Sequence, residues 1–489
     1  MSARPASDAL PGTDAGTASS AAALPAGTDA ALRDVVGPKG VIEGGDLAQR
    51  LEEWRGKWRG RTPLALAPAS TAEVARIVRI CADARIAITP QGGNTGLVGG
   101  QTPTNGEVLI LLHRMNRIRS VDPLDATMTL DAGVTLAAAQ DAAASADRLF
   151  PLSIGSEGTC QIGGIVSTNA GGVNVIRYGN TRDLVLGLEA VTAAGEIWNG
   201  LKRLRKDNTG YDLKQLLIGG EGTLGIVTAA TVKLFPRPKE KATALVGLAS
   251  PAAALELLAL AQDASGGQTT SFELISGAAY DLCVRNVPGV RHALAGRHAW
   301  HVLFEFSSGQ IGVLRPMLEA LLADAYARGL VADGVIAESE AQAHDLWRMR
   351  HALSEAMKPE GLQAKHDVSA PLSDVPRFLE LADAGVERAC PGARVIAFGH
   401  LGDGNIHYDV LRPAGVDDAA FRARLRDVEA AVYAAVDAVD GSISAEHGVG
   451  LARRDDLATR KDPAALAMMR SVKAALDPHG IMNPGKMLR

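Results

Sequence analysis

The chain has 489 residues, a length typical of two or three domains. Hydrophobic residues form 47% of it and charged residues 21%, a composition that fits a globular protein and excludes a wholly disordered chain. The net charge of −5 gives no electrostatic reason to expect nucleic acid or an anionic membrane as a partner.

The N-terminal region has few structural signals. Residues 1–30 are mostly Ala, Ser, Gly, Thr and Pro, which predicts a flexible tail, and we expect a helical segment over 31–57. No basic stretch precedes an apolar run, and Arg is sparse, so neither a secretory signal nor a transit peptide is predicted. No run approaches the about 20 apolar residues that span a bilayer. The four cysteines lie far apart without a CxxC motif, which indicates free thiols in a reducing compartment.

Alternating helix and strand signals then predict an α+β or α/β domain over residues 58–238. A helix is expected over 70–85, because Ser70 and Glu73 fit a capping box and apolar residues follow at helical spacing. Extended segments are expected at 85–90, 107–112, 127–131 and 226–235, with a helix at 136–146. Pro236 and Pro238 close this unit, so we place a domain boundary near residue 238.

The pattern changes after the boundary and predicts a second α+β domain over residues 239–489. Helical segments rich in Ala and Leu are expected at 251–263, 314–328, 340–358, 417–439 and 463–476. Strands are expected between them, at 242–248, 299–306, 394–398 and 406–411.

Three glycine-rich blocks precede residue 226, at 91–101, 155–172 and 219–225. The third contains GxGxxG, but a strand follows it where a dinucleotide-binding motif requires a helix, so NAD is not indicated. Glycines let backbone N–H groups converge on phosphate oxygens, although tight turns alone also explain one such loop. The presence of all three favours a large phosphate-bearing ligand.

Two short segments near the C-terminus concentrate the chemistry, GHLGDGNIH (399–407) and SAEHG (444–448). A hairpin turned by LGDGN brings His400 and His407 near each other. With Glu446 they form a set of two imidazoles and one carboxylate, which suits a catalytic Zn²⁺ and also Fe²⁺ or Mn²⁺. His447, next to the carboxylate, is the candidate proton acceptor. The plain alternative is that these histidines only form hydrogen bonds within a polar turn.

The segments PQGGNTGLVGG (90–100), SEGTCQIGGIVSTNAGG (156–172), RYGNTRDLVLGLEAV (177–191) and IGGEGTLGIVT (218–228) resemble the FAD-binding domain of the vanillyl-alcohol oxidase type, also called the PCMH type. The second half, with GHLGDGNIH, EHG and HGIMNPGKML (479–488), is similar to the C-terminal domain of FAD-linked oxidases. Together they resemble the D-2-hydroxyacid dehydrogenases over roughly residues 58–489. The resemblance implies an α+β fold: a two-part FAD-binding domain, an α+β substrate (cap) domain and a C-terminal helical segment.

The resemblance also implies a set of residues around FAD. Some relatives bind the flavin covalently through a histidine in the first loop; here Asn94 stands in that loop without a histidine, so non-covalent FAD is expected. The implied cofactor residues are Pro90, Gly92, Gly93, Asn94, Thr95, Gly96, Ser156, Glu157, Gly158, Thr159, Gly163, Ser167, Asn169, Gly171, Gly172, Gly222, Ile226 and Val227.

The same resemblance assigns the metal to His400, His407 and Glu446, and the base to His447. A 2-hydroxy acid must lose a hydroxyl proton and a hydride, and FAD is the two-electron acceptor because no side chain can serve as one. By resemblance to the hydroxyglutarate enzymes, the substrate carboxylate is held by Arg350, Ser354 and Lys365.

One position departs from the family pattern. Asp409 stands where the family often has Asn, and on a strand it shares a face with His407. A carboxylate there repels an anionic substrate tail unless it is protonated or paired. The substrate could therefore be D-2-hydroxyglutarate, D-lactate, glycolate or a longer hydroxy acid.

The sequence thus predicts an FAD-dependent D-2-hydroxyacid dehydrogenase with a divalent metal, first of all Zn²⁺. Its electrons are expected to pass to an electron-transfer flavoprotein, a quinone or a cytochrome. We expect a cytoplasmic protein, with peripheral attachment to the inner membrane as the open alternative. For the oligomeric state, a homodimer is left open. A glycolate oxidase-type subunit, a non-catalytic FAD-binding subunit and a metal-dependent hydrolase that uses the same ligands to activate water remain the rival functions.

Overall fold

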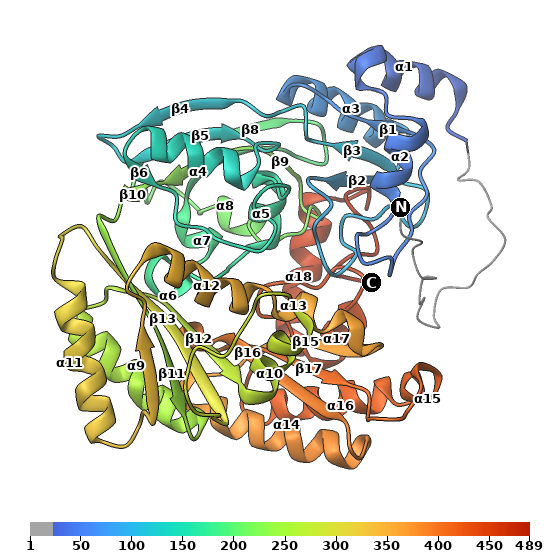
Figure 1. Cartoon of the computed structure of the whole chain (residues 1–489). Helices are drawn as coiled ribbons and strands as arrows, with labels where there is room; N and C mark the ends of the chain where they lie inside the picture. The colour runs from blue at the N-terminus through green and yellow to red at the C-terminus, as the bar shows by residue number, and fades with distance from the viewer. Residues whose placement is uncertain (1–22) are drawn as a thin grey trace.

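The structure is a computed structural model that describes residues 23–489. The flexible tail expected over 1–30 lies mostly outside the described residues, and helix α1 (Ala26–Val36) begins inside that range. Figure 1 shows two parts, one above the other, with the C-terminal segment between them. No helix within residues 23–489 has both the length and the apolar character needed to cross a membrane.

A small parallel sheet in the upper part carries the first glycine loop. Its order is β1-β3-β2, with β1 (Ala65–Leu66), β2 (Ile88–Gln91) and β3 (Val108–Leu111). Helix α3 (Thr71–Asp83) begins as expected, because the Ser70 hydroxyl accepts the Glu73 N–H at 3.2 Å and the Glu73 carboxylate accepts the Ala69 N–H at 2.8 Å. The short elements α2 (Gly44–Leu51) and η1 (Pro38–Gly40) precede it.

A five-stranded antiparallel sheet forms the rest of the upper part, in the order β4-β5-β9-β7-β8. Its strands are β4 (Ile118–Asp122), β5 (Thr127–Asp131), β7 (Val185–Val191), β8 (Ile197–Gly200) and β9 (Ile226–Lys233). Around it lie α4 (Leu136–Ser145), α5 (Ile162–Thr168), α6 (Val175–Tyr178), α7 (Thr181–Leu184) and α8 (Lys214–Leu217), with β6 (Arg148–Leu149) paired to β10 (Phe235–Pro236).

A seven-stranded antiparallel sheet organises the lower part, in the order β14-β11-β13-β12-β16-β17-β15. Its strands are β11 (Glu240–Leu248), β12 (Thr269–Ser276), β13 (Trp300–Ser308), β14 (Asp333–Ile336), β15 (Gln363–Ser369), β16 (Arg394–His400) and β17 (Asn405–Leu411). The expected strands at 242–248, 299–306, 394–398 and 406–411 are confirmed as β11, β13, β16 and β17.

Helices cover the two faces of this sheet unequally. Against one face, a core that includes Phe272, Phe304 and Tyr408 packs on α9 (Pro251–Ser265), α11 (Leu314–Ala327), α14 (Val375–Ala389) and α16 (Leu425–Asp437). The other face packs on α10 (Gly277–Asn286), α12 (Glu340–His351) and α13 (Leu353–Ala356). The helix expected over 340–358 is thus two helices followed by the turn η2 (Lys358–Glu360). The sheet carries the polar residues His407 and Asp409 on β17, opposite Asp367 and Lys365 of β15.

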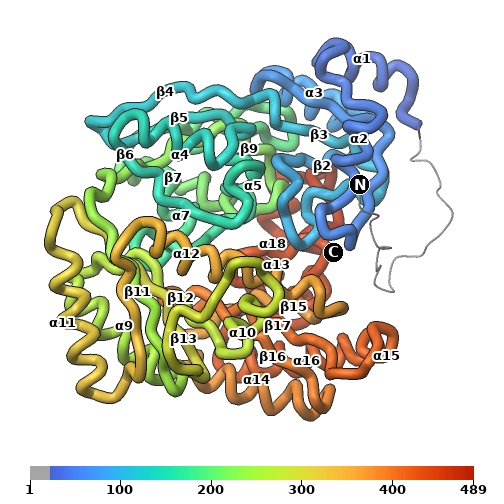
Figure 2. Tube along the Cα trace, in the orientation of Figure 1, coloured from blue at the N-terminus to red at the C-terminus, as the bar shows by residue number. Residues whose placement is uncertain are grey.

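The C-terminal segment returns to the upper part (Figure 2). After α15 (Asp418–Arg422), α17 (Arg454–Arg460) and α18 (Pro463–Leu476), Met482 forms a parallel bridge with Ile88 beside β2. The Lys486 ammonium then lies 2.8 Å from the Glu107 carboxylate, with both side chains fully buried. The last residues of the chain are therefore part of the core that supports the first glycine loop.

Candidate active site

The hairpin expected around LGDGN is present. Strands β16 and β17 pair antiparallel and are joined by the turn η4 (Leu401–Asp403), which ends at Gly404 with φ 79°. His400 ends β16 and His407 lies on β17, and their ring centroids are 5.7 Å apart. The two imidazoles are therefore neighbours, as the spacing predicted.

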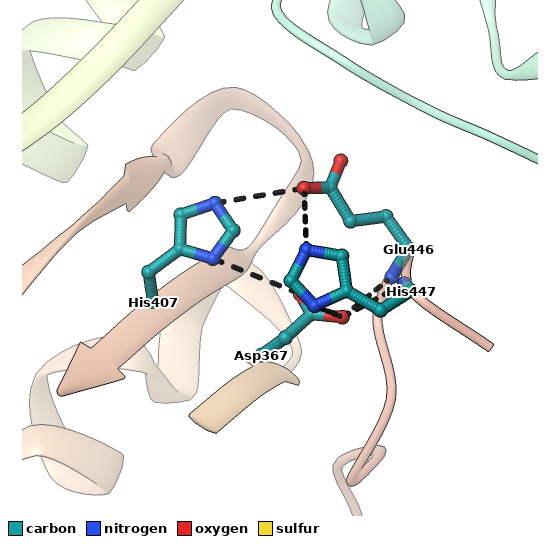
Figure 3. A group of neighbouring side chains, drawn as sticks. All are labelled: Asp367, His407, Glu446 and His447. Atoms are coloured by element: carbon teal, nitrogen blue, oxygen red, sulfur yellow. Dashed lines mark hydrogen bonds and ion pairs between the residues drawn. The ribbon is translucent and has the colours of Figure 1, made fainter. Parts of the chain in front are cut away.

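Four side chains converge beside this hairpin: Asp367 from β15, His407 from β17, and Glu446 and His447 from the loop after α16 (Figure 3). One possible ligand atom from each lies within 4.8 Å of the others. Glu446 Oε1 is 3.6 Å from His407 Nε2 and 3.5 Å from His447 Nε2. The two imidazole rings are nearly parallel, with centroids 5.8 Å apart. A carboxylate oxygen and two imidazole nitrogens thus face a common point.

Asp367, which the sequence reasoning did not single out, lies under this group and is fully buried. Its carboxylate accepts the backbone N–H of Glu446 at 3.1 Å and of His447 at 2.9 Å, and the side-chain amide of Asn405 at 2.9 Å. The Nδ1 atom of His447 is 3.3 Å from the carboxylate, and that of His407 is 3.9 Å away. Asp367 therefore orients both rings so that each Nε2 faces Glu446.

His400 lies beside the four-residue group and not within it. Its Nδ1 is 2.7 Å from Oε1 of Glu273, a fully buried carboxylate of β12 that also binds Arg350 at 2.7 Å. Burial works to lower the pKa of His400, but the Glu273 charge raises that pKa to about 9. With Nδ1 directed at a carboxylate, Nε2 is the nitrogen left for a ligand, an arrangement typical of metal-binding histidines.

The charge states of the cluster suit a divalent cation. Burial lowers the pKa of His407 to about 4, so its imidazole is neutral near pH 7 and can donate a lone pair. Burial opposes ionisation of Glu446, but the His447 hydrogen bond and the nearby histidines hold its pKa below the usual range. The neutral His407 imidazole and the ionised Glu446 carboxylate are fitting donors for Zn²⁺, Fe²⁺ or Mn²⁺.

The expected substrate-binding residues are placed differently from one another. Arg350, at the end of α12, is buried over the Phe398 ring at 5.0 Å, and its Nη2 has no hydrogen-bond partner among the described residues. Lys365 lies on β15, with its ammonium 3.6 Å from the buried Asp409 carboxylate. Ser354 lies on α13 and is exposed. Among these three residues, the structure thus offers one unsatisfied guanidinium nitrogen and one paired ammonium.

The three glycine blocks come together in the upper part. A Cβ on Gly93 would lie 2.0 Å from the Thr159 carbonyl, so the first two blocks touch through bare backbone. The Glu221 N–H donates to the Ser167 carbonyl at 2.8 Å, which joins the third block to the second. Open space lies beside Gly155, Gly158 and Gly164, where a Cβ would meet no atom within 4 Å. The blocks therefore fit a large ligand that approaches their backbone closely.

Comparison with known proteins identifies that ligand. The chain matches the FAD binding domain over residues 63–200 and the C-terminal domain of FAD linked oxidases over residues 237–487. It is 38% identical to the mitochondrial D-2-hydroxyglutarate dehydrogenase of Arabidopsis thaliana, covering 94% of this chain and 80% of that protein. It is 37% identical to the D-2-hydroxyglutarate dehydrogenase of Xanthomonas citri pv. viticola, covering 91% and 93%.

Solved structures share the fold. The 4-ethylphenol oxidase of Gulosibacter chungangensis superimposes with a TM-score of 0.70 at 17% identity, covering 96% of this chain and 98% of that one. The p-cresol methylhydroxylase superimposes with a TM-score of 0.69 at 16% identity, covering 94% and 96%. The predicted α+β fold with an FAD-binding domain of the PCMH type is therefore confirmed.

Fold and relatives define the class: an FAD-dependent dehydrogenase that acts on CH–OH groups. The chain belongs to the FAD-linked oxidase family, among relatives of the D-2-hydroxyglutarate dehydrogenases.

Proposed function

We propose that the protein oxidises a D-2-hydroxy acid to the 2-keto acid, with a divalent metal at the cluster and His447 as the base. The observation that carries the proposal is the convergence of His407 Nε2, His447 Nε2 and Glu446 Oε1 above the buried Asp367 carboxylate. His400, with Glu273 behind it, is the third proposed metal ligand beside His407 and Glu446. We propose Zn²⁺ first, with Mn²⁺ and Fe²⁺ as alternatives.

FAD, when bound, supplies the acceptor for the hydride, and a divalent cation acidifies a hydroxyl beside it. The chain's own residues bind the acid and move the proton. His447 is the proposed acceptor of the hydroxyl proton through Nε2, because Nδ1 faces Asp367 and Nε2 faces the point beside Glu446 Oε1. The Asp367 carboxylate then stabilises the positive charge that His447 gains. The proposed cofactor residues of the three glycine blocks hold FAD without a covalent bond.

Arg350 is the proposed anchor for the C1 carboxylate. Its Nε is held by Glu273 at 2.7 Å, which fixes the guanidinium plane, while its buried Nη2 lacks a partner among the described residues. A carboxylate that accepts from Nη2 satisfies that donor, and buried donors without partners cost about 1–3 kcal/mol. We propose the hydroxyl of Ser354, on the exposed side of α13, as a further substrate contact.

The substrate tail is the open part of the proposal. The printed names of the relatives give D-2-hydroxyglutarate for those proteins, which makes it the first candidate. The Lys365–Asp409 pair favours a second, D-lactate or glycolate, because Asp409 neutralises the ammonium that a distal carboxylate requires. The electron acceptor that we propose is an electron-transfer flavoprotein, a quinone or a cytochrome. We propose a cytoplasmic location, with peripheral attachment to the inner membrane as the alternative. A homodimer is the oligomeric state that we propose. We also propose that residues 58–238 and 239–489 are its two domains.

The experiment that tests the proposal is anaerobic flavin reduction by paired D- and L-2-hydroxy acids: hydroxyglutarate, lactate and glycerate, with achiral glycolate. The proposal predicts rapid loss of the oxidised flavin absorbance with at least one D-acid and a rate at least about 100-fold lower with its L-enantiomer. A flavoprotein that no 2-hydroxy acid reduces would be a non-catalytic subunit. Ester or amide hydrolysis without flavin reduction would instead support the metal-dependent hydrolase.

A further inference from the structure

Two buried carboxylates, one from each part of the molecule, hold the loop that carries Glu446 and His447. Asp367 from the seven-stranded sheet accepts the N–H groups of Glu446 and His447. Glu221 from the third glycine block accepts two N–H groups further along the loop: its Oε1 accepts Val449 N–H and its Oε2 accepts Gly450 N–H, both at 2.7 Å. Each carboxylate oxygen of Glu221 thus accepts one backbone N–H of that loop.

The backbone at Glu221 is specialised for this contact. Glu221 has φ +50°, a left-handed conformation that costs a non-glycine residue about 1 kcal/mol or more. Its N–H donates to Ser167 O at 2.8 Å, and its carbonyl accepts the Asn483 side chain at 2.8 Å. The same Asn483 amide donates to Gly100 O at 2.9 Å. Glu221 is therefore fixed by the second glycine block directly and by the first through Asn483 of the C-terminal segment.

The loop is shaped to receive that carboxylate. A Cβ on Gly448 would lie 2.8 Å from Glu221 Oε1, and Gly448 has φ +83°, so a side chain there would push the loop away. Past the contact, Leu451 N and Ala452 N donate to Val98 O, at 2.8 and 3.2 Å, which ties the loop to the first glycine block as well. The loop after His447 thus rests on the cofactor loops, while its start rests on the seven-stranded sheet.

We infer that Glu221 is a positioning residue, which holds the loop of Glu446 and His447 at a fixed position relative to the three glycine blocks. The inference rests on the proposed function, since it takes Glu446 as a metal ligand and His447 as the base. Glu221 acts on the site through its hydrogen bonds to the N–H groups of Val449 and Gly450. A displacement of about 1 Å at reacting groups can lower a rate by about 100-fold, so a remote carboxylate of this kind controls catalysis without touching substrate.

The test compares Glu221→Gln with Glu189→Gln in the FAD-loaded enzyme. Glu189 is a matched control: it is buried in the same part, and its carboxylate accepts from Thr71, Thr228 and Arg119, far in sequence from the loop. In Glu221→Gln, the amide oxygen can still accept one of the two N–H groups of Val449 and Gly450, while the amide NH₂ group faces the other and cannot accept it. Hydrogen exchange of a peptide spanning 446–452, the dissociation constant of Zn²⁺ alone, and kcat and KM are measured for both variants.

Glu221→Gln is expected to speed exchange in that peptide by about 10- to 100-fold, because one backbone N–H of the loop loses its acceptor and faces the amide NH₂ group instead. Its Zn²⁺ dissociation constant should rise by about 10- to 100-fold, and kcat should fall at least about 10-fold with KM within about threefold. Flavin content should match that of Glu189→Gln, which keeps wild-type exchange in this peptide. Gly448→Ala, which displaces the loop and leaves the carboxylate intact, should give the same exchange pattern.

Unchanged exchange in the 446–452 peptide of Glu221→Gln would overturn the inference, as would equal losses of kcat in Glu221→Gln and Glu189→Gln. The exchange readout needs neither metal nor turnover. If the wild-type protein binds no Zn²⁺ and no hydroxy acid reduces its flavin, the proposed function fails, while exchange still decides whether Glu221 holds the loop.

Discussion

Asp409 and Lys365 form a cross-strand pair directly beside the pair Asp367 and His407, on the same face of β15 and β17. Neighbouring rungs on one face lie about 7 Å apart, within the length of a small hydroxy acid. Burial raises the pKa of Asp409, and Lys365 works in the opposite direction. The net charge of the Lys365–Asp409 pair is therefore expected to determine which substrate tail binds.

Asp409→Asn is predicted to shift preference towards a dicarboxylic acid. The change removes the partner of the Lys365 ammonium at 3.6 Å and leaves a cation next to the substrate tail. KM for D-2-hydroxyglutarate should fall by about tenfold, the value of one charge-assisted hydrogen bond, while KM for D-lactate stays within about threefold.

Steady-state kinetics with both acids measures the shift. Asp409→Asn combined with Lys365→Met provides the control, because the gain for hydroxyglutarate should disappear with the ammonium. If the lower KM for D-2-hydroxyglutarate persists without Lys365, the Lys365–Asp409 pair does not recognise the substrate tail.

At the scale of elements, the first two glycine blocks approach so closely that there is no room between them for a side chain at position 93. Gly93→Ala would place Cβ 2.0 Å from Thr159 O and 2.8 Å from its carbonyl carbon. The blocks must then separate, so the FAD content of the purified protein is predicted to fall to less than about one tenth. Gly27→Ala in α1, where a Cβ meets nothing within 4 Å, should keep full flavin content. Absorbance ratios of flavin to protein measure both, and a fully loaded Gly93→Ala protein would contradict the predicted cradle.

The sequence predicted the elements whose signals are local. The Ser70 and Glu73 cap, the glycine blocks and the LGDGN hairpin depend on neighbours within a few residues, and the structure contains them all. Strand β15 was not predicted, because QAKHDVS mixes charges with apolar residues and becomes a strand by pairing with β17.

Three site residues were missed for the same reason, because their roles depend on tertiary pairing. Asp367 lies on that unpredicted strand, and Glu273 lies 127 positions before His400 in the chain. Glu221 stands in a glycine block that was interpreted only as a ligand loop, 228 positions before Val449. The sequence therefore pointed to the chemical groups at the cluster and not to the buried carboxylates that orient them, since such contacts form only through tertiary pairing.

At the scale of the whole molecule, the chain closes on itself through a fully buried ion pair, Lys486 with Glu107, at 2.8 Å. Lys486→Met leaves the Glu107 charge buried without its partner, so the free energy of unfolding should fall by about 3–5 kcal/mol. The double variant Lys486→Met, Glu107→Leu removes the charge as well and should recover most of the loss. Denaturant unfolding followed by fluorescence measures the three proteins, and equal stability of the single variant and the wild type would contradict the role of this pair.

The two parts depend on each other at the active site. The upper part provides the glycine blocks and Glu221, and the lower part provides Asp367 and the histidines, while the loop with Glu446 and His447 is bonded to both. A cation and a flavin bound to these residues therefore belong to one reaction centre in this account.

Metal removal from the FAD-loaded enzyme tests that centre most directly. Flavin reduction by the preferred D-2-hydroxy acid is followed anaerobically by stopped flow, before and after treatment with a chelator and after Zn²⁺ or Mn²⁺ is restored. Chelation is expected to lower the rate of flavin reduction by at least about 100-fold without releasing FAD, and one of the two metals is expected to restore it. A metal-depleted enzyme whose flavin is reduced at the original rate would contradict the account.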